Sequence, residues 1–189
     1  MVTKHLKQGE SCMNREAMTE TVRERARRNH LEGCNCGESI FRALLETLRE
    51  ANLTDMPLET VTLAAGLGGG IGSSGNTCCA IIGGCMGIGI VHGRKDPLLL
   101  PTPEARRNQL AGDEGLYRLY NNFVFDVKKT IGSTSCAELT CPYDYYSDER
   151  KQYCRNIIGE AAALAMKWIF IGIDEGYRHP FNYNIMGKK

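Results

Sequence analysis

The sequence predicts an all-α protein, a compact multi-helix bundle with a glycine-rich loop before a central helix of small residues. Few segments alternate between apolar and polar residues with a period of two, which argues against a β-sheet. Several segments instead place apolar residues at helical spacing between breaks that contain glycine or proline. At 189 residues the chain is long enough for one domain with a sizeable core.

The expected helices can be placed in order along the chain. Residues 1–14 are expected to form a flexible N-terminal arm, and residues 15–189 a single helical redox domain. The helices are assigned from helix-forming residues, apolar spacing and start signals such as a proline near the first turn. They cover residues 15–31, 39–51, 58–67, 77–92, 104–131 and 148–172, and a short further helix carries Cys136.

Charge and targeting signals narrow the possible function classes. The chain has 23 Lys and Arg against 22 Asp and Glu, so it offers no basic field for nucleic acid. Its first residues lack the apolar core of a signal peptide, and we therefore expect a cytoplasmic protein. Residues 60–93 carry no Lys, Arg, Asp or Glu, but glycines and polar residues interrupt them, so membrane contact is not expected.

Nine cysteines are the most informative part of the composition. In a reducing cytosol, cysteines indicate metal binding or catalysis before structural disulfides, and an odd number cannot be fully paired within one chain. Backbone N–H groups and the helix dipole stabilise a thiolate at a helix start and lower its pKa. The cysteines at or near predicted helix starts are Cys36, Cys78, Cys79 and Cys136.

Cysteine spacing separates several kinds of site. The close spacings are Cys-x-Cys, Cys-Cys and Cys-x4-Cys. They favour neither a zinc knuckle nor a thioredoxin-like Cys-x-x-Cys site. The motif for covalent haem attachment, Cys-x-x-Cys-His, is missing. Iron–sulfur clusters accept thiolates gathered from more varied spacings. A metal-free thiol–disulfide oxidoreductase or redox switch stays open as the alternative, in which Cys78 or Cys79 would attack and Cys36 or Cys136 would resolve.

A glycine-rich loop precedes the Cys78-Cys79 pair. The stretch from Gly70 to Gly75 matches the dinucleotide fingerprint GxGxxG, but the residues before it have a helical pattern, whereas that fingerprint follows a strand. Gly70, Gly72 and Gly75 are instead expected to let the backbone approach a cofactor closely.

Several segments together resemble the C_GCAxxG_C_C family of redox-active proteins. The resemblance covers about residues 30–170 and rests on a glycine loop and four cysteine segments. These segments are Asn35-Cys36 leading into an amphipathic helix, Cys78-x-Ala80-x-x-Gly83, Cys136-Ala137-Glu138-Leu139, and Cys154 before an alanine-rich helix.

The resemblance implies a cofactor, a ligand set and partners. The family's four cysteines match Cys36, Cys78, Cys136 and Cys154, with Cys79 and Cys141 as substitutes. The chain is also similar to the iron–sulfur module of split-Soret cytochrome c. These likenesses imply an iron–sulfur cluster for electron transfer or redox sensing, a homodimer and a separate redox partner protein. Cys79 stands where relatives commonly have glycine, which leaves open whether Cys78 or Cys79 is the ligand.

Overall fold

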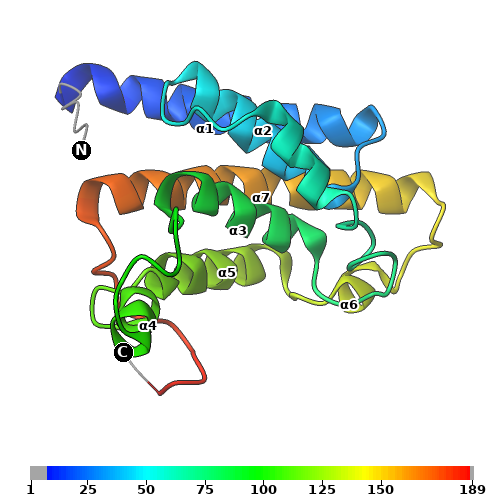
Figure 1. The fold of residues 1–189 in the computed structure, drawn as a ribbon. Helices are drawn as coiled ribbons and strands as arrows, with labels where there is room; N and C mark the ends of the chain where they lie inside the picture. The colour runs from blue at the N-terminus through cyan, green and yellow to red at the C-terminus, as the bar shows by residue number, and fades with distance from the viewer. Residues whose placement is uncertain (1–7, 188–189) are drawn as a thin grey trace.

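The chain folds into a bundle of helices arranged around one long helix, α7 (Figure 1). The structure is a computed structural model that describes residues 8–187. No β-strand occurs among these residues, so the predicted all-α class is confirmed. The elements are α1 (Gln8–Leu31), α2 (Cys36–Glu50), the 3-10 helix η1 (Leu58–Ala64), α3 (Cys79–His92), α4 (Pro103–Ala111), α5 (Tyr117–Ile131), α6 (Cys136–Thr140) and α7 (Asp148–Glu175).

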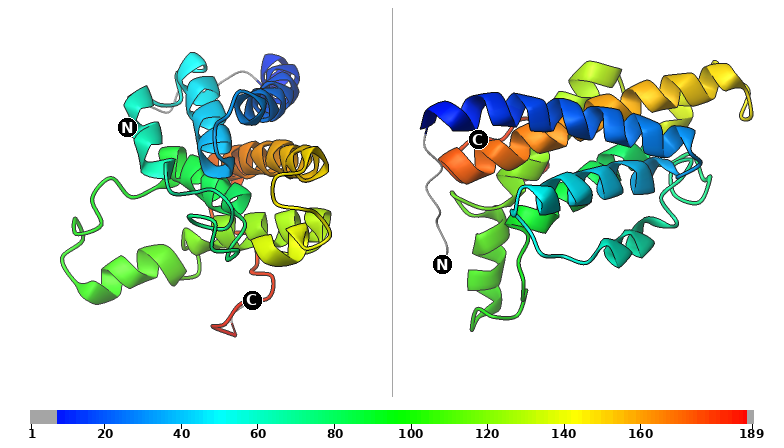
Figure 2. Two further views of the ribbon diagram at one scale, coloured as in Figure 1. Left: turned by 90° about the vertical axis from the view of Figure 1, so that its right-hand side faces the viewer. Right: turned by 90° about the horizontal axis from the view of Figure 1, so that it is seen from above.

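Helix α7 is at the centre because its apolar residues cover most of its circumference. It packs against α1, α2, α3 and α5, and it runs beside α1 along most of its length (Figure 2). Small residues such as Ala161 and Ala165 are fully buried and allow close helix approach, while Met166 and Ile169 fill the interior. On the solvent side, Glu160 pairs with Arg23 of α1 at 2.5 Å.

Helix α3 packs unusually closely against its neighbours because glycines line its contact faces. A Cβ on Gly83 would lie 2.9 Å from the carbonyl oxygen of Gly37 in α2. A Cβ on Gly84 would overlap the ring of Phe123 in α5, and one on Gly87 would overlap the side chain of Leu44. The predicted small-residue helix therefore acts as a close crossing point inside the bundle.

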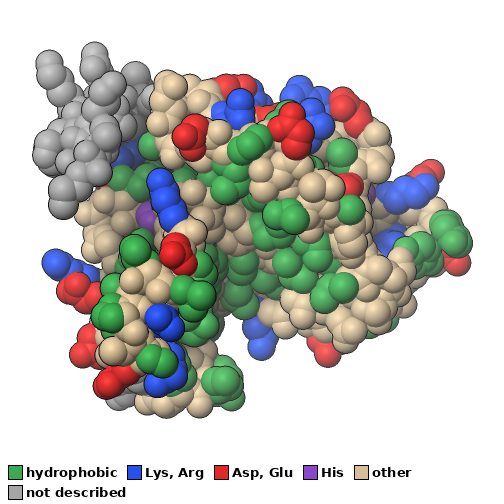
Figure 3. Space-filling model, in the orientation of Figure 1, with side chains coloured by type: hydrophobic (Ala, Val, Ile, Leu, Met, Phe, Trp, Pro, Cys, Tyr) green, Lys and Arg blue, Asp and Glu red, His purple; other side chains and the backbone are tan. Residues whose placement is uncertain are grey.

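Two helices carry long apolar stretches. Of the described residues, only α7 forms a helix long and apolar enough to cross a membrane, and most of that stretch is buried in the bundle, as in any core helix. Helix α3 is shorter, and Ile82, Met86 and Ile90 on it are half-buried. Figure 3 shows apolar side chains gathered over the middle of one face of the molecule, with charged side chains around them.

The segment from 104 to 131 was predicted as one helix, and this prediction is wrong. It forms α4 and α5, separated by a turn at residues 112–116. The amide of Gly112 ends α4 by bonding to the Asn108 carbonyl, and Gly115 packs so tightly on the Leu110 carbonyl that a Cβ there would clash. Helix α4 buries no side chain of its own and projects from the bundle (Figure 2).

Other predicted boundaries also differ from the structure. The helix predicted over residues 58–67 is the shorter 3-10 helix η1, in keeping with its β-branched run Thr60-Val61-Thr62. Helix α1 begins at Gln8, inside the expected arm, because a nucleated helix extends at little cost per residue. Residues 1–7 of that arm lie outside the described residues.

The glycine loop between η1 and α3 is a left-handed turn. Five consecutive residues have positive φ: Gly69 (57°), Gly70 (73°), Ile71 (68°), Gly72 (56°) and Ser73 (63°). Such a conformation costs roughly 1–2 kcal/mol for each residue with a Cβ, so glycine at three of the five positions keeps the cost low. Non-glycine residues held in this region are frequent at functional sites.

Replacing Gly83 with Ala should destabilise the protein by about 1–3 kcal/mol, because the added methyl group would press on the backbone of α2. The matched control is Gly89→Ala in the same helix, where the nearest atom would be the Tyr120 hydroxyl at 3.4 Å. This control should be neutral or stabilising by up to about 1 kcal/mol because alanine is the better helix former. Urea unfolding of both variants measures the difference, and equal effects would contradict the close crossing.

A second pair of alanine variants tests the left-handed turn. A Cβ on Gly72 or on Gly66 would have no atom within 4 Å, but only Gly72 has a positive φ. Gly72→Ala should therefore lower the free energy of unfolding by about 1 kcal/mol through backbone strain alone. Gly66→Ala should leave it unchanged or raise it by a few tenths of a kcal/mol. Thermal and urea unfolding give both values, and a harmless Gly72→Ala would show that the turn is not left-handed.

Candidate functional site

Five cysteines line one cavity of about 400 Å³, which we call the thiol cavity. They come from the N-terminal ends of four helices that lie far apart in the sequence. Cys36 begins α2, Cys78 caps α3, Cys79 begins α3, Cys136 begins α6, and Cys154 lies in the second turn of α7. The prediction that cysteines occupy helix starts is confirmed, and the structure brings together all four expected ligands and Cys79.

Cys36 is fixed in place by the capping of α2. The Asn35 side chain accepts the N–H of Glu38 at 2.9 Å, and the Glu38 carboxylate accepts the N–H of Asn35 at 2.9 Å, which forms a capping box. The Asn35 amide also donates to the carbonyl oxygens of Ala64 and Ala65, at 3.1 Å and 3.0 Å. The start of α2 is therefore tied to the end of η1 directly before the glycine loop.

Cys78 and Cys136 are placed by a short antiparallel backbone pairing. Thr77 and Ser135 form an isolated bridge, the Cys78 N–H donates to the Thr134 carbonyl at 2.8 Å, and the Cys136 N–H donates to the Asn76 carbonyl at 2.7 Å. Residues one step along from a bridged pair project from the same face of the two strands. The pairing thus turns both thiols toward the cavity, and it brings α6 beside the start of α3 (Figure 1).

The left-handed turn directs backbone N–H groups at the cavity sulfurs. The Ile71 N–H donates to Cys79 Sγ at 3.1 Å, and the N–H of Gly70 also acts on this thiol. The N–H of Gly69 acts on Cys36 in the same way. Gly70 and Gly72 line the cavity as expected, whereas Gly75 contacts Ala137 of α6.

The expectation that helix starts would lower the thiol pKa values is wrong for this cavity. Burial raises the pKa of Cys36 to about 12 and that of Cys78 to about 11, and the neighbouring cysteines raise both further. Burial also raises the pKa of Cys79 and of Cys154. The backbone N–H groups act in the opposite direction but do not offset the loss of solvent, so these thiols are neutral near pH 7.

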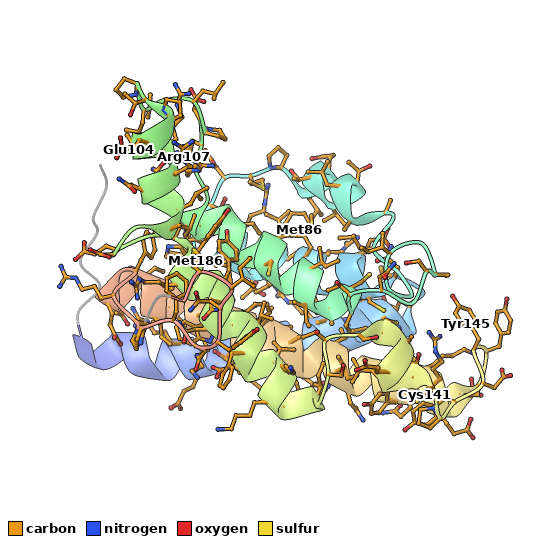
Figure 4. All side chains as sticks on the ribbon, turned by 90° about the horizontal axis from the view of Figure 1, so that it is seen from below. Met86, Glu104, Arg107, Cys141, Tyr145 and Met186 are labelled. Atoms are coloured by element: carbon orange, nitrogen blue, oxygen red, sulfur yellow. The ribbon has the colours of Figure 1, made fainter. Side chains whose placement is uncertain are left out.

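The charged side chains that line the cavity are all basic: His30, Arg150 and Lys151. Arg150 lies one helical turn before Cys154, and its charge partly offsets the rise in the pKa of that thiol. Tyr145, in the segment between α6 and α7, lies at the same cavity (Figure 4). None of these residues was predicted from the sequence as part of a site. The four-residue spacing of Arg150 and Cys154 was a usable signal, whereas Tyr145 and His30 left none.

The remaining cysteines lie elsewhere. Cys141, the second expected substitute ligand, is exposed at the end of α6, where its thiol donates to the Glu138 carbonyl at 3.3 Å (Figure 4). Cys34 is half-buried outside the cavity, and Cys85 packs against the hydrophobic core, as its apolar neighbours predicted. The side chain of Cys12 is outside the described part of the chain.

The donor set of the thiol cavity fits a soft metal centre. Its metal-binding groups are thiols, with one imidazole and no carboxylate among the lining residues, and the backbone N–H groups of the turn face sulfur atoms. Thiolate donors with such N–H contacts suit iron–sulfur clusters, whereas hard cations require oxygen ligands. No group of three His, Cys, Asp or Glu side chains in residues 15–187 is arranged to hold a single metal ion.

A protein-family model described as "Putative redox-active protein (C_GCAxxG_C_C)" matches residues 34–168, which is well over half of the chain. No curated protein and no solved structure gives a significant match. The family match contains all five cysteines that line the cavity.

The pattern in the family's description corrects one alignment. It places glycine before the central cysteine and alanine after it, so GCAxxG corresponds to residues 78–83 with Cys79 as the motif cysteine. Cys78 therefore stands at the glycine position, where the sequence analysis had placed Cys79. The second glycine of the pattern is Gly83, the residue at the close crossing of α2 and α3. The chain belongs to the C_GCAxxG_C_C family of redox-active proteins.

Proposed function

We propose that the thiol cavity binds an iron–sulfur cluster that serves electron transfer or redox sensing. The observation that carries this proposal is the convergence of five cysteines from four separate elements on one cavity without a carboxylate. When bound, such a cluster supplies a one-electron redox couple at a potential that the surrounding protein tunes. The ligands we propose are Cys36, Cys136 and Cys154 together with the motif cysteine Cys79.

The chain's own groups would tune such a centre in a definite direction. The N–H groups of Ile71 and Gly70 face Cys79, and the N–H of Gly69 faces Cys36. Donors aimed at ligand sulfurs stabilise added negative charge and so raise the reduction potential. The basic side chains of the cavity would act in the same direction. The left-handed turn is thus a positioning device for backbone donors.

The raised pKa values favour a cluster over thiol chemistry without metal. The thiolate is the attacking form in thiol–disulfide exchange, and a thiol with a pKa near 11 or 12 supplies little of it at pH 7. A metal that coordinates a thiol deprotonates it outright, so burial is no obstacle to ligation.

A metal-free thiol–disulfide oxidoreductase is the second candidate. It is favoured by one observation, namely that Cys79 accepts the Ile71 N–H at 3.1 Å and so has a donor that would stabilise its thiolate. In that function Cys79 would be the attacking thiol and Cys78, Cys36 or Cys136 the resolving one. Anaerobic metal analysis separates the two candidates.

Protein purified without oxygen should be coloured and contain iron and acid-labile sulfide. Cys36→Ser, Cys136→Ser and Cys154→Ser should each lower bound iron severalfold, because each variant removes a ligand. Cys79→Gly should do the same, whereas Cys78→Gly, which restores the family pattern, should retain iron. Visible absorption together with iron and sulfide assays provides the measurement.

The matched control is Cys141→Ser, which changes an exposed cysteine outside the cavity and should bind as much iron as the parent protein. A colourless protein without iron or sulfide would contradict the cluster. Loss of iron in Cys78→Gly with retention in Cys79→Gly would reverse the assignment of the central ligand.

The stability of the metal-free, reduced protein should fall at alkaline pH. The pKa values of Cys36 and Cys78 are higher in the folded state than the ordinary value of about 8.5. Their neutral forms are therefore favoured by folding, so stability is complete below about pH 8.5 and declines as the pH rises toward 11. Each such thiol contributes a slope of about 1.4 kcal/mol per pH unit.

Urea unfolding between pH 7 and 10.5 measures this decline. Cys36→Ala should give a shallower slope than the parent protein, whatever its stability at pH 7, and Cys141→Ser should give the same slope. Parallel slopes for the parent and Cys36→Ala would show that Cys36 is not buried as a neutral thiol.

The expected homodimer and redox partner stay predictions, and sedimentation of the purified chain tests the dimer.

A further inference from the structure

We propose that the thiol cavity contains a second subsite, which binds the oxyanion of a small molecule through His30 and Arg150, with the charge of Arg155 close to His30. The oxyanion is a carboxylate or a tetrahedral group such as sulfate. Its use as a substrate or regulatory site beside the redox centre rests on the proposed function, whereas anion binding itself does not.

The cavity carries positive charge without a matching acidic group. Of the basic side chains at the cavity, Lys151 is already paired with Asp148 at 2.9 Å. Among the described residues, no ion pair involves Arg150 or Arg155, and no acidic side chain lines the cavity. Burial lowers the pKa of His30, and the positive charges of Arg155 and Arg150 lower it further. His30 and Arg150 therefore line the cavity without an acidic partner there, and the positive charge of Arg155 lies close to His30.

One lining side chain has a buried polar atom without a partner. Within the described structure, Nδ1 of His30 is shielded from solvent and has no hydrogen-bond partner. Leaving a buried polar group unsatisfied costs roughly 1–3 kcal/mol, so native structures rarely contain one without a reason. An oxyanion in the cavity could accept from this nitrogen when it carries a proton, and its charge would favour that protonated form.

The guanidinium of Arg150 is held in place by Tyr145. Its guanidinium lies 4.3 Å from the centre of the Tyr145 ring and donates to the Tyr145 carbonyl at 3.0 Å. The Tyr145 hydroxyl is 2.7 Å from Ser73 Oγ, which links this residue to the left-handed turn. A guanidinium held by stacking loses little freedom on binding, and its planar donor set matches an oxyanion.

The size of the cavity indicates a small molecule. A volume of about 400 Å³ falls within the range of roughly 300–1,000 Å³ that is usual for small-molecule sites. A ligand whose oxyanion binds His30 and Arg150 would share the cavity with the thiols. The subsite would thus place the reactive part of an anionic molecule beside the redox groups.

The test uses calorimetric titration of the full, metal-free, reduced chain with sodium sulfate and separately with sodium malonate, at ionic strength held constant with chloride. Binding of sulfate alone, of malonate alone, or of both assigns the oxyanion class. Arg150→Gln should weaken binding at least tenfold, whereas Arg150→Lys and Arg155→Gln should each weaken it severalfold. Arg107→Gln, which removes an exposed arginine on α4, should bind as the parent does (Figure 4).

A second measurement follows His30 by NMR. Its pKa should rise when the anion binds, since a negative charge then offsets the two arginines, and the shift should disappear in Arg150→Gln. Absence of heat and of any His30 shift with both anions relative to chloride would overturn the subsite. Competition between anion and iron loading would also overturn it, because the basic groups would then serve only the cluster. Anion binding by a protein that never takes up iron would refute the cluster and leave the subsite intact.

Discussion

The close crossing of α2 and α3 at Gly37 and Gly83 is the constraint on which the site depends. The backbones approach so closely that a Cβ on Gly83 would lie 2.9 Å from the Gly37 carbonyl oxygen. Cys36 precedes one glycine directly, and Cys79 lies one helical turn before the other. The crossing therefore sets the distance between the backbones that carry Cys36 and Cys79, whatever the packing of the surrounding side chains. This accounts for glycine at the final position of the family's central motif.

The thiol cavity combines two opposing effects on its sulfur atoms. Burial favours the neutral thiol, while the N–H groups of the left-handed turn and the charge of Arg150 favour the thiolate. In the metal-free protein, burial has the larger effect on the thiol pKa values. The thiols therefore react slowly with oxidants and disulfides. Coordination to a metal, as proposed, would reverse the balance, because the same N–H groups would then face charged ligands. In such a site, buried neutral thiols resist oxidation when no metal is present, and the N–H groups would stabilise the thiolates once a metal is bound.

Most helices, and the positions of the cysteines at helix starts, could be predicted from the sequence, because capping residues, glycine breaks and apolar spacing are local signals. The turn between α4 and α5 was missed, since two isolated glycines in a helical pattern resemble tolerated substitutions. The thiol pKa values were predicted in the wrong direction because burial depends on the packing of α1 and α7, which no local pattern contains. For the same reason, His30 and Tyr145 could not be assigned to the cavity before the fold was known.

The order in which the thiols occur along the chain has a consequence for biosynthesis. The cavity takes its walls from α2, the glycine loop, α3, α6 and α7, so its last cysteine, Cys154, is among the last parts of the domain to be synthesised. A nascent chain that still lacks α7 also lacks the central helix against which the others pack. The complete set of thiols therefore assembles only after α7 has been synthesised, and any group that all of them hold would be inserted after that point.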